Sequence, residues 1–185
     1  MYIFKWKPIK INWKDETSFP VLISTSIGGY EQRKLKSERS RRIWTYTFKK
    51  RVESDAFEEE IMDFYEARKG VYGSFYLPSF MQETKLSDDY TAGQTTISVN
   101  SSIKFTDTKG ERGNYLCIEK SGEFEVSRIT DISGNVITIE TAFNNNYSSG
   151  SYVHRAYKVR FLDSLERNSI FNVAYTAEIK FQEVL

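Results

Sequence analysis

The side chains that could do acid–base chemistry are few and scattered along the sequence. His154 is the only histidine, and it lies in "SYVHRAYKV", where apolar and polar residues alternate as they do in a β-strand. A histidine base needs a nucleophile or a second acid–base group placed beside it, and the neighbouring sequence supplies none. We therefore expect His154 to have a structural or surface role.

Two pairs of carboxylates and one thiol are the other candidates for chemistry. Glu123 and Glu125 lie two residues apart on one face of a predicted strand, whereas paired catalytic carboxylates usually come from separate elements. Asp88 and Asp89 lack the spacing of oxygen ligands in a calcium-binding loop. Cys117 is the only cysteine, which excludes an intrachain disulfide and a metal site built from several cysteines. The sequence therefore predicts no catalytic residue, no metal and no cofactor, and a protein that is not an enzyme.

Most of the chain has the two-residue alternation of β-strands. In residues 42–51 every second residue from Trp44 to Phe48 is aromatic, as in a half-buried antiparallel strand. A longer alternation covers residues 171–182, and a shorter one at residues 157–161 precedes it across the turn sequence "DSLERNS". We expect these two segments to form a hairpin.

One helix is predicted between Ser54 and Gly70. Ser54 is a favourable N-cap, acidic residues fill the first turns, where they suit the helix dipole, and Gly70 is typical of a helix C-terminus. Gly73, a few residues further on, leaves room for a close approach of the backbone. The apolar stripe of this helix consists of Phe57, Ile61, Phe64 and Tyr65.

The composition changes after Phe80. Residues 84–155 are rich in Ser, Thr, Asn and Gly, and their short predicted strands are separated by turn sequences such as "KSGE" and "ISGN". Short strands at this spacing are typical of a small barrel or sandwich. We predict a mainly β fold with one flanking α-helix, in which residues 84–155 form an inserted small β-barrel module and residues 1–83 and 156–185 form a discontinuous outer domain.

The charges are nearly balanced overall but separated locally. A formal net charge of +1 argues against a surface built as a whole to bind nucleic acid or anionic membrane. Residues 31–53 contain nine Lys or Arg and three acids, a net +6, whereas residues 53–63 contain six acids and no base. A contact between this basic run and the acidic helix of another copy is one interpretation, and a solvated basic loop is the second. Nucleic-acid binding by Trp44 and Tyr46 is a third, although strand alternation directs both rings toward a core.

Contact residues between subunits are predicted from this charge separation and from the aromatic segment "GVYGSFYLPSF" that follows the helix. Core packing does not need every ring of that segment, and aromatic residues are enriched at the centres of interfaces. The predicted contact residues are Arg33, Lys34, Arg39, Arg41, Arg42, Glu58, Glu59, Glu60, Tyr72, Phe75 and Tyr76.

Three segments in a fixed order carry a family resemblance. They are "FP" at 19–20, "GYEQRKLKSERSRRIWTYTF" at 29–48 and "FYEARKGVYGSFYLPSF" at 64–80. Together they resemble phage tail proteins of the distal tail type, including relatives in prophages and gene transfer agents. Residues 84–155, with "AGQTTISVNSSIKF" and "ISGN", resemble a second module that recurs in tail proteins.

The resemblance implies a structural protein of the virion, placed at the tail tip. Distal tail proteins form hexameric rings that join the tail tube to the baseplate hub and the receptor-binding apparatus. Their amino-terminal domains resemble tail-tube subunits, with a β-sandwich, a flanking helix and a lumen through which DNA passes. The expected partners are further copies of this chain, the tail-tube protein, and baseplate hub or tail fibre proteins. The run "KLKSERSRR" is more basic than in many relatives, so we place it outside the lumen.

An alternative from another class is a carbohydrate- or receptor-binding module. In this hypothesis the inserted barrel binds its ligand with Tyr90, Tyr147 and Tyr152. Under either hypothesis the amino terminus has no continuous apolar h-region, and no stretch approaches the roughly 18 apolar residues of a spanning helix. We expect folding and assembly in the host cytoplasm and no membrane partner.

Overall fold

The computed structural model describes residues 1–15, 21–25, 30–35, 41–49, 55–165 and 176–184. These residues are mainly β with one helix, which confirms the predicted fold class. The chain forms two compact units. Unit 1 comprises Met1–Lys7 and Phe75–Lys158, and unit 2 comprises Pro8–Ser74 and Val159–Leu185.

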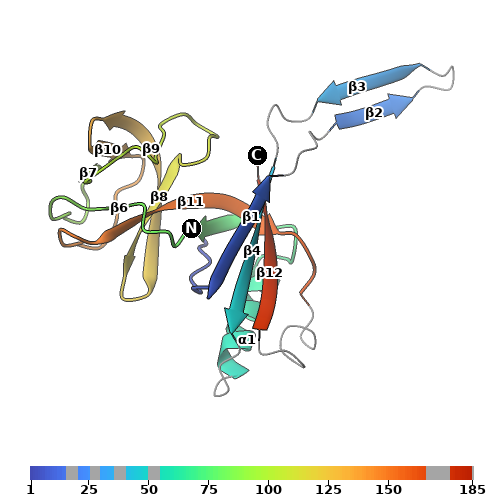
Figure 1. Cartoon of the computed structure of the whole chain (residues 1–185), viewed down its shortest axis with the longest axis horizontal. Helices are drawn as coiled ribbons and strands as arrows, with labels where there is room; N and C mark the ends of the chain where they lie inside the picture. The colour runs from blue at the N-terminus through green and yellow to red at the C-terminus, as the bar shows by residue number, and fades with distance from the viewer. Residues whose placement is uncertain (16–20, 26–29, 36–40, 50–54, 166–175, 185) are drawn as a thin grey trace. The chain divides into compact units, whose positions relative to one another are not determined.

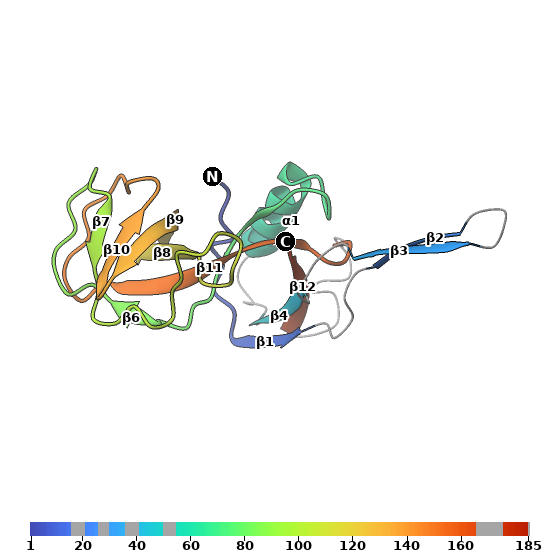
Figure 2. The ribbon, with the colours of Figure 1, turned by 90° about the horizontal axis from the view of Figure 1, so that it is seen from above.

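Unit 1 is an antiparallel sheet that closes on itself around an apolar core (Figure 2). Its hydrogen-bonded order is β11-β8-β9-β10-β7, β6 pairs with β11, and the bridge between Leu86 and Val99 completes the ring of strands. Closure removes the open edges that an antiparallel sheet would otherwise expose. The strands are β5 (Phe75–Pro78), β6 (Thr84–Lys85), β7 (Thr96–Ser98), β8 (Tyr115–Lys120), β9 (Glu123–Ser133), β10 (Val136–Ile139) and β11 (Tyr152–Phe161).

The alternation of β8 shows how the sequence divides its side chains between the two faces of this sheet. Leu116 and Ile118 are buried inside the barrel core, whereas Cys117 belongs to a separate apolar cluster with Phe124 and Val126. The "KSGE" turn between β8 and β9 places Gly122 at φ 83°, in the left-handed region that glycine adopts without strain.

The amino-terminal residues and β5 also belong to unit 1. Ile3 forms a parallel bridge with Tyr76, the Phe4 N–H donates to the Tyr76 carbonyl at 2.8 Å, and β5 pairs with β11. Unit 1 thus comprises residues 75–158 together with residues 1–7, whereas the predicted module comprises residues 84–155. These differences arise from backbone pairing between segments that are far apart in the sequence.

Unit 2 contains a sheet in the order β1-β4-β12, next to which the last residues of β11 pair with β12 (Figure 1). Its strands are β1 (Lys10–Asp15), β4 (Arg42–Lys49) and β12 (Thr176–Glu183). Phe161 of β11 is opposite Phe181 of β12, so the predicted antiparallel pairing of these two segments is confirmed. The turn between them and residues 171–175 of the predicted strand lie outside the described residues.

The helix α1 (Asp55–Ala67) packs on the sheet of unit 2. Ile61 is fully buried, and the rings of Phe64 and Tyr65 lie edge-on to Phe161, with centroids 6.3 and 5.0 Å away. Ser54 and the side chain of Phe57 lie outside the described residues. In the described part of unit 2, α1 packs on a single sheet, and no second sheet faces it as in a β-sandwich. The predicted likeness to a tail-tube subunit therefore stays a prediction.

The two predicted glycine positions after the helix are confirmed by geometry. Gly70 has φ 63°, and its N–H donates to the Tyr65 carbonyl at 2.9 Å, which ends the helix. A Cβ at Gly73 would lie 2.3 Å from the Arg68 carbonyl oxygen. Because that neighbour is backbone, no side chain fits at Gly73 without a shift of the chain.

Candidate subunit interface

A hairpin that leaves its side chains uncovered is the most unusual feature of unit 2. β2 (Val21–Thr25) and β3 (Glu31–Leu35) form a two-stranded sheet of their own, with Ile23 opposite Arg33 (Figure 1). Successive residues of a strand point to opposite faces, so exposure of successive residues leaves both faces uncovered. The side chains exposed in and beside this hairpin are Ile23, Ser24, Thr25, Tyr30, Glu31, Gln32, Arg33 and Lys34.

Two of these exposed residues are large and apolar. Ile23 is 57% exposed and Tyr30 is 80% exposed. A single exposed apolar residue is ordinary at a protein surface, but an isolated two-stranded hairpin is at best marginally stable in water. Covering Ile23 and Tyr30 by a partner would therefore stabilise the hairpin as well as the complex.

The charged residues of the hairpin are not equally available for a contact. Glu31 and Arg33 lie two apart on the same face of β3 and form an ion pair within the hairpin. Lys34 lies on the opposite face and is exposed. Of the two basic residues predicted here, Lys34 is thus the better candidate for a charge contact with another copy.

The rest of the predicted basic run is partly built into unit 2. Arg39 lies outside the described residues, and Arg41 and Arg42 are half-buried at the start of β4. The Arg42 N–H donates at 3.1 Å to the carboxylate of Glu183, a buried residue of β12. A carboxylate at position 42 would add negative charge beside buried Glu183, so charge reversal here would disturb the sheet as well as any contact between copies.

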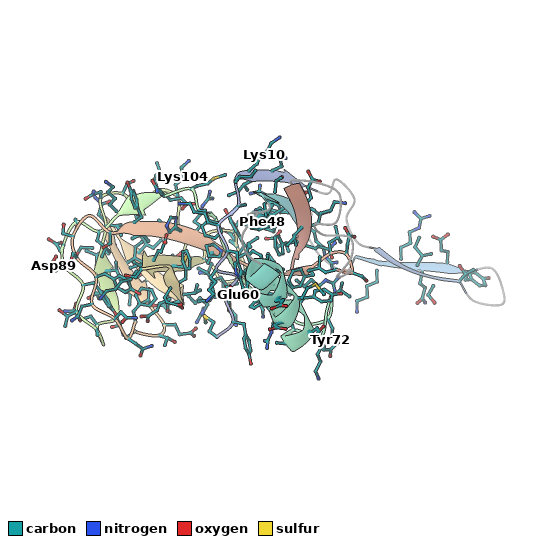
Figure 3. All side chains as sticks on the ribbon, turned by 90° about the horizontal axis from the view of Figure 1, so that it is seen from below. Lys10, Phe48, Glu60, Tyr72, Asp89 and Lys104 are labelled. Atoms are coloured by element: carbon teal, nitrogen blue, oxygen red, sulfur yellow. The ribbon has the colours of Figure 1, made fainter. Side chains whose placement is uncertain are left out.

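The exposed face of α1 is acidic, as predicted. Glu59, Glu60, Asp63 and Glu66 are exposed, whereas Ile61 is fully buried (Figure 3, Glu60 labelled). The side chain of Glu58 lies outside the described residues. From Glu59 onward, the helix therefore presents clustered negative charge to solvent.

The three aromatic residues predicted for the interface differ in environment. Tyr72, which follows α1, is 83% exposed (Figure 3). Tyr76 is half-buried, its hydroxyl bonds to Tyr115, and burial together with that bond raises its pKa. Phe75 is 1% exposed and packs against Phe4 with ring centroids 6.2 Å apart. Side chains alternate along β5, and that of Phe75 points into the core of unit 1. It therefore does not fit the predicted contact role.

The tyrosines proposed for glycan binding are mostly core residues. Tyr90 and Tyr147 are buried, and the Tyr90 hydroxyl accepts a hydrogen bond from the Phe143 N–H at 2.8 Å. Tyr152 remains partly exposed, but the Lys85 ammonium lies 4.7 Å from its ring centroid and covers one face. Buried rings offer no surface for a sugar to stack on, which leaves this hypothesis with one of its three residues.

The carboxylates considered as catalytic or metal-binding groups in unit 1 each bond to a different part of the chain. Glu125 accepts hydrogen bonds from the N–H groups of Asn144 and Asn145 at 2.6 and 3.1 Å, and so holds a loop. Glu123 forms an exposed ion pair with Lys5 at 3.8 Å. Asp89 accepts from the Ser149 N–H at 2.7 Å. Across the part of the chain that the structure describes, no group of three or more His, Cys, Asp or Glu side chains is placed to hold a metal ion.

His154 and Cys117 are buried in unit 1. They are opposite each other on β11 and β8, and burial lowers the pKa of His154 and raises that of Cys117. An activated cysteine is a thiolate beside a charged or basic histidine, whereas here the imidazole is neutral and the thiol is protonated, so the two do not form a catalytic pair.

The only described helix is too short and too polar to cross a membrane.

Two buried carboxylates, those of Glu83 and Glu183, were not predicted from the sequence. The Glu83 carboxylate accepts from the Arg155 backbone N–H and Nε, both at 3.0 Å, and Glu183 accepts from the Arg42 N–H. Both carboxylates satisfy partners far away in the sequence, so no local pattern marks them.

Comparison with known proteins adds no family assignment. No family model and no curated protein matches this sequence. The resemblance to distal tail proteins therefore rests on the ordered segments at 19–20, 29–48 and 64–80.

Proposed function

We propose that this chain is a non-enzymatic structural protein of a phage tail tip, which assembles with further copies of itself into a ring. The observation that supports this proposal best is the β2–β3 hairpin, whose described side chains are exposed on both faces. The hairpin lies between and within the segments that resemble distal tail proteins. A surface that the chain itself leaves uncovered fits a protein completed by its neighbours.

The charges suggest how neighbouring copies meet. Lys34 is exposed on the hairpin, and Glu59 and Glu60 are exposed on α1. Opposite charges on two different patches suit a heterologous contact, in which the hairpin of one copy meets the helix of the next. Such contacts form a ring when the rotation between copies closes. Tyr72 is a further candidate for this contact because it is exposed near the end of α1.

The remaining parts of the proposal follow from the resemblance. The ring, hexameric in distal tail proteins, would join the tail tube to baseplate hub or tail fibre proteins, and DNA would pass through its lumen. Assembly would take place in the host cytoplasm and the mature protein would reside in the virion. The barrel of unit 1 would serve as a structural module of the ring.

Assembly of the full chain tests the proposal directly. We expect rings in negative-stain images and a multiple of the monomer mass by light scattering. The double variant Ile23→Asp, Tyr30→Asp should raise the dissociation constant of assembly by at least about a hundredfold, because burying each large apolar side chain contributes roughly 1.5–3 kcal/mol.

A matched control separates this effect from a general loss of surface apolarity. Ile103 is 84% exposed in unit 1, outside the hairpin, so Ile103→Asp should leave assembly unchanged. Circular dichroism should show that all variants are folded. The proposal is wrong if the wild-type chain stays monomeric both alone and with tail-tube protein, or if the hairpin variant assembles as the wild type does.

A further inference from the structure

A short strap in unit 1 is held in an unfavourable backbone conformation. Residues 79–83 connect β5 to β6, and both of these strands pair with β11. Within the strap, Phe80 has φ 55° and Gln82 has φ 50°. A residue other than glycine adopts such values at a cost of roughly 1–3 kcal/mol, so the closed strap needs compensating contacts.

Both ends of the strap are fixed by hydrogen bonds to β11. The Ser79 N–H donates to the Arg155 carbonyl at 2.9 Å. The Glu83 carboxylate, on a side chain that is 4% exposed, accepts from the Ser79 hydroxyl at 2.6 Å and from the Arg155 N–H and Nε at 3.0 Å. These bonds leave the middle of the strap, Phe80 to Gln82, to be held by other means.

The middle of the strap is held by a buried histidine. The Gln82 N–H donates to Nδ1 of His154 at 3.1 Å, and Phe80 packs on Phe124, with ring centroids 5.5 Å apart. A backbone N–H can only donate, so Nδ1 must offer its lone pair. The single proton of the neutral ring is then on Nε2, which is buried and has no hydrogen-bond partner.

The charged groups around His154 do not offset its burial. Glu83 on the strap and Glu119 on β8 favour the imidazolium, whereas Lys7 of the amino-terminal segment opposes it. Glu83 is already bonded to Arg155, and Cys117 on β8 is protonated because burial raises its pKa. Burial is the largest of these influences, and it holds the pKa of His154 below the usual value near 6.5.

We propose that residues 79–83 are an acid-released strap, closed while His154 is neutral and opened when His154 takes up a proton. The proton adds to the lone pair of Nδ1, which then carries an N–H that points at the Gln82 N–H. Two donors 3.1 Å apart cannot bond, so the Gln82 amide must turn to water. The strain at Phe80 and Gln82 then favours opening, and it uncovers the apolar cluster of Phe124, Val126 and Cys117.

The pH window follows from the direction of the shift. The pKa of His154 is lowered in the closed state, so the open state binds more protons. The closed state is therefore fully favoured above pH 6.5 and loses this advantage as pH falls through 6.5 toward the pKa of the closed state. From pH 7.5 to 5.5, one proton can raise the open population by up to about tenfold.

Amide hydrogen exchange of the full-length chain, followed by NMR and corrected for intrinsic rates, tests the strap. We expect the exchange of Gln82 to rise by up to about tenfold from pH 7.5 to 5.5, and to level off once the pH falls below the midpoint of the His154 Cε1–H titration. Exchange of Ile118, in the middle of the barrel, should stay constant because the barrel remains closed.

Two variants complete the test. In His154→Asn, Oδ1 can accept the Gln82 N–H near the position of Nδ1, but the amide does not titrate, so the pH response of Gln82 should disappear. If His154→Asn fails to fold, His154→Gln takes its place; its side chain does not titrate either, so the pH response of Gln82 should again disappear. The proposal is overturned if Gln82 exchange shows no rise, if Ile118 accelerates in parallel, or if the folded variant keeps the wild-type response.

Discussion

The barrel of unit 1 and the β2–β3 hairpin of unit 2 are both built from antiparallel strands, but they differ in how far their side chains are buried. In the barrel, Leu116 and Ile118 are buried, and Glu125 holds the Asn144–Asn145 loop by hydrogen bonds. In the hairpin, described residues on both faces of the strands are exposed. The barrel therefore has a core within its own chain, whereas the described side chains of the hairpin are left exposed.

Truncation of an apolar side chain should have the largest effect in the barrel. Leu116→Ala should lower the free energy of unfolding by about 3 kcal/mol, because it leaves a cavity in a closed core. The matched change Ile23→Ala in the hairpin should change the stability of the monomer by less than about 0.5 kcal/mol. Urea unfolding of the two variants measures both. Similar losses would mean that the chain itself covers Ile23.

Removal of a carboxylate should also destabilise the barrel more than the hairpin, by a smaller difference than truncation of an apolar side chain. Glu125→Ala should destabilise unit 1 by about 1–3 kcal/mol, because the N–H groups of Asn144 and Asn145 lose their acceptor. Glu31→Ala removes an exposed ion pair in the hairpin, which should cost no more than about 0.5 kcal/mol. Thermal unfolding of both variants tests this difference, and a larger effect of Glu31→Ala would contradict it.

Loss of one surface charge should have the smallest effect. Lys34→Ala should weaken assembly by up to about fivefold, since an exposed ion pair contributes roughly 0.2–1 kcal/mol, and the loss should diminish at high salt. Lys104, exposed in unit 1, provides the control (Figure 3). Sedimentation velocity at two salt concentrations measures both variants, and equal effects of Lys34→Ala and Lys104→Ala would remove the proposed charge contact.

Local patterns predicted β4, α1 and several strands of the barrel, but not β1, β2 or β3. Alternation from Trp44 to Phe48 predicted β4, and the apolar stripe and Gly70 predicted α1 and its end. The mainly β class follows from these elements, since period and turn chemistry are properties of neighbouring residues.

The assignment of segments to units depends on contacts that no local pattern encodes. Residues 1–7 join unit 1 through the pairing of Ile3 with Tyr76. Both Phe75 and Tyr72 are aromatic, so residue type alone does not show that the first is buried and the second exposed. The burial of Tyr90 and Tyr147 likewise depends on the bridge between these two residues, which closes a loop of the barrel. For the candidate interface, the sequence indicated charges and rings, but exposure decided which of them remain available.

The burial of Cys117, the only cysteine of the chain, has a practical consequence for spectroscopy. At neutral pH its thiolate is scarce and shielded, so maleimide dyes should leave it unmodified. A cysteine introduced at the exposed Gln32 position would then carry the fluorophore alone, and energy transfer between labelled copies could follow their association in real time.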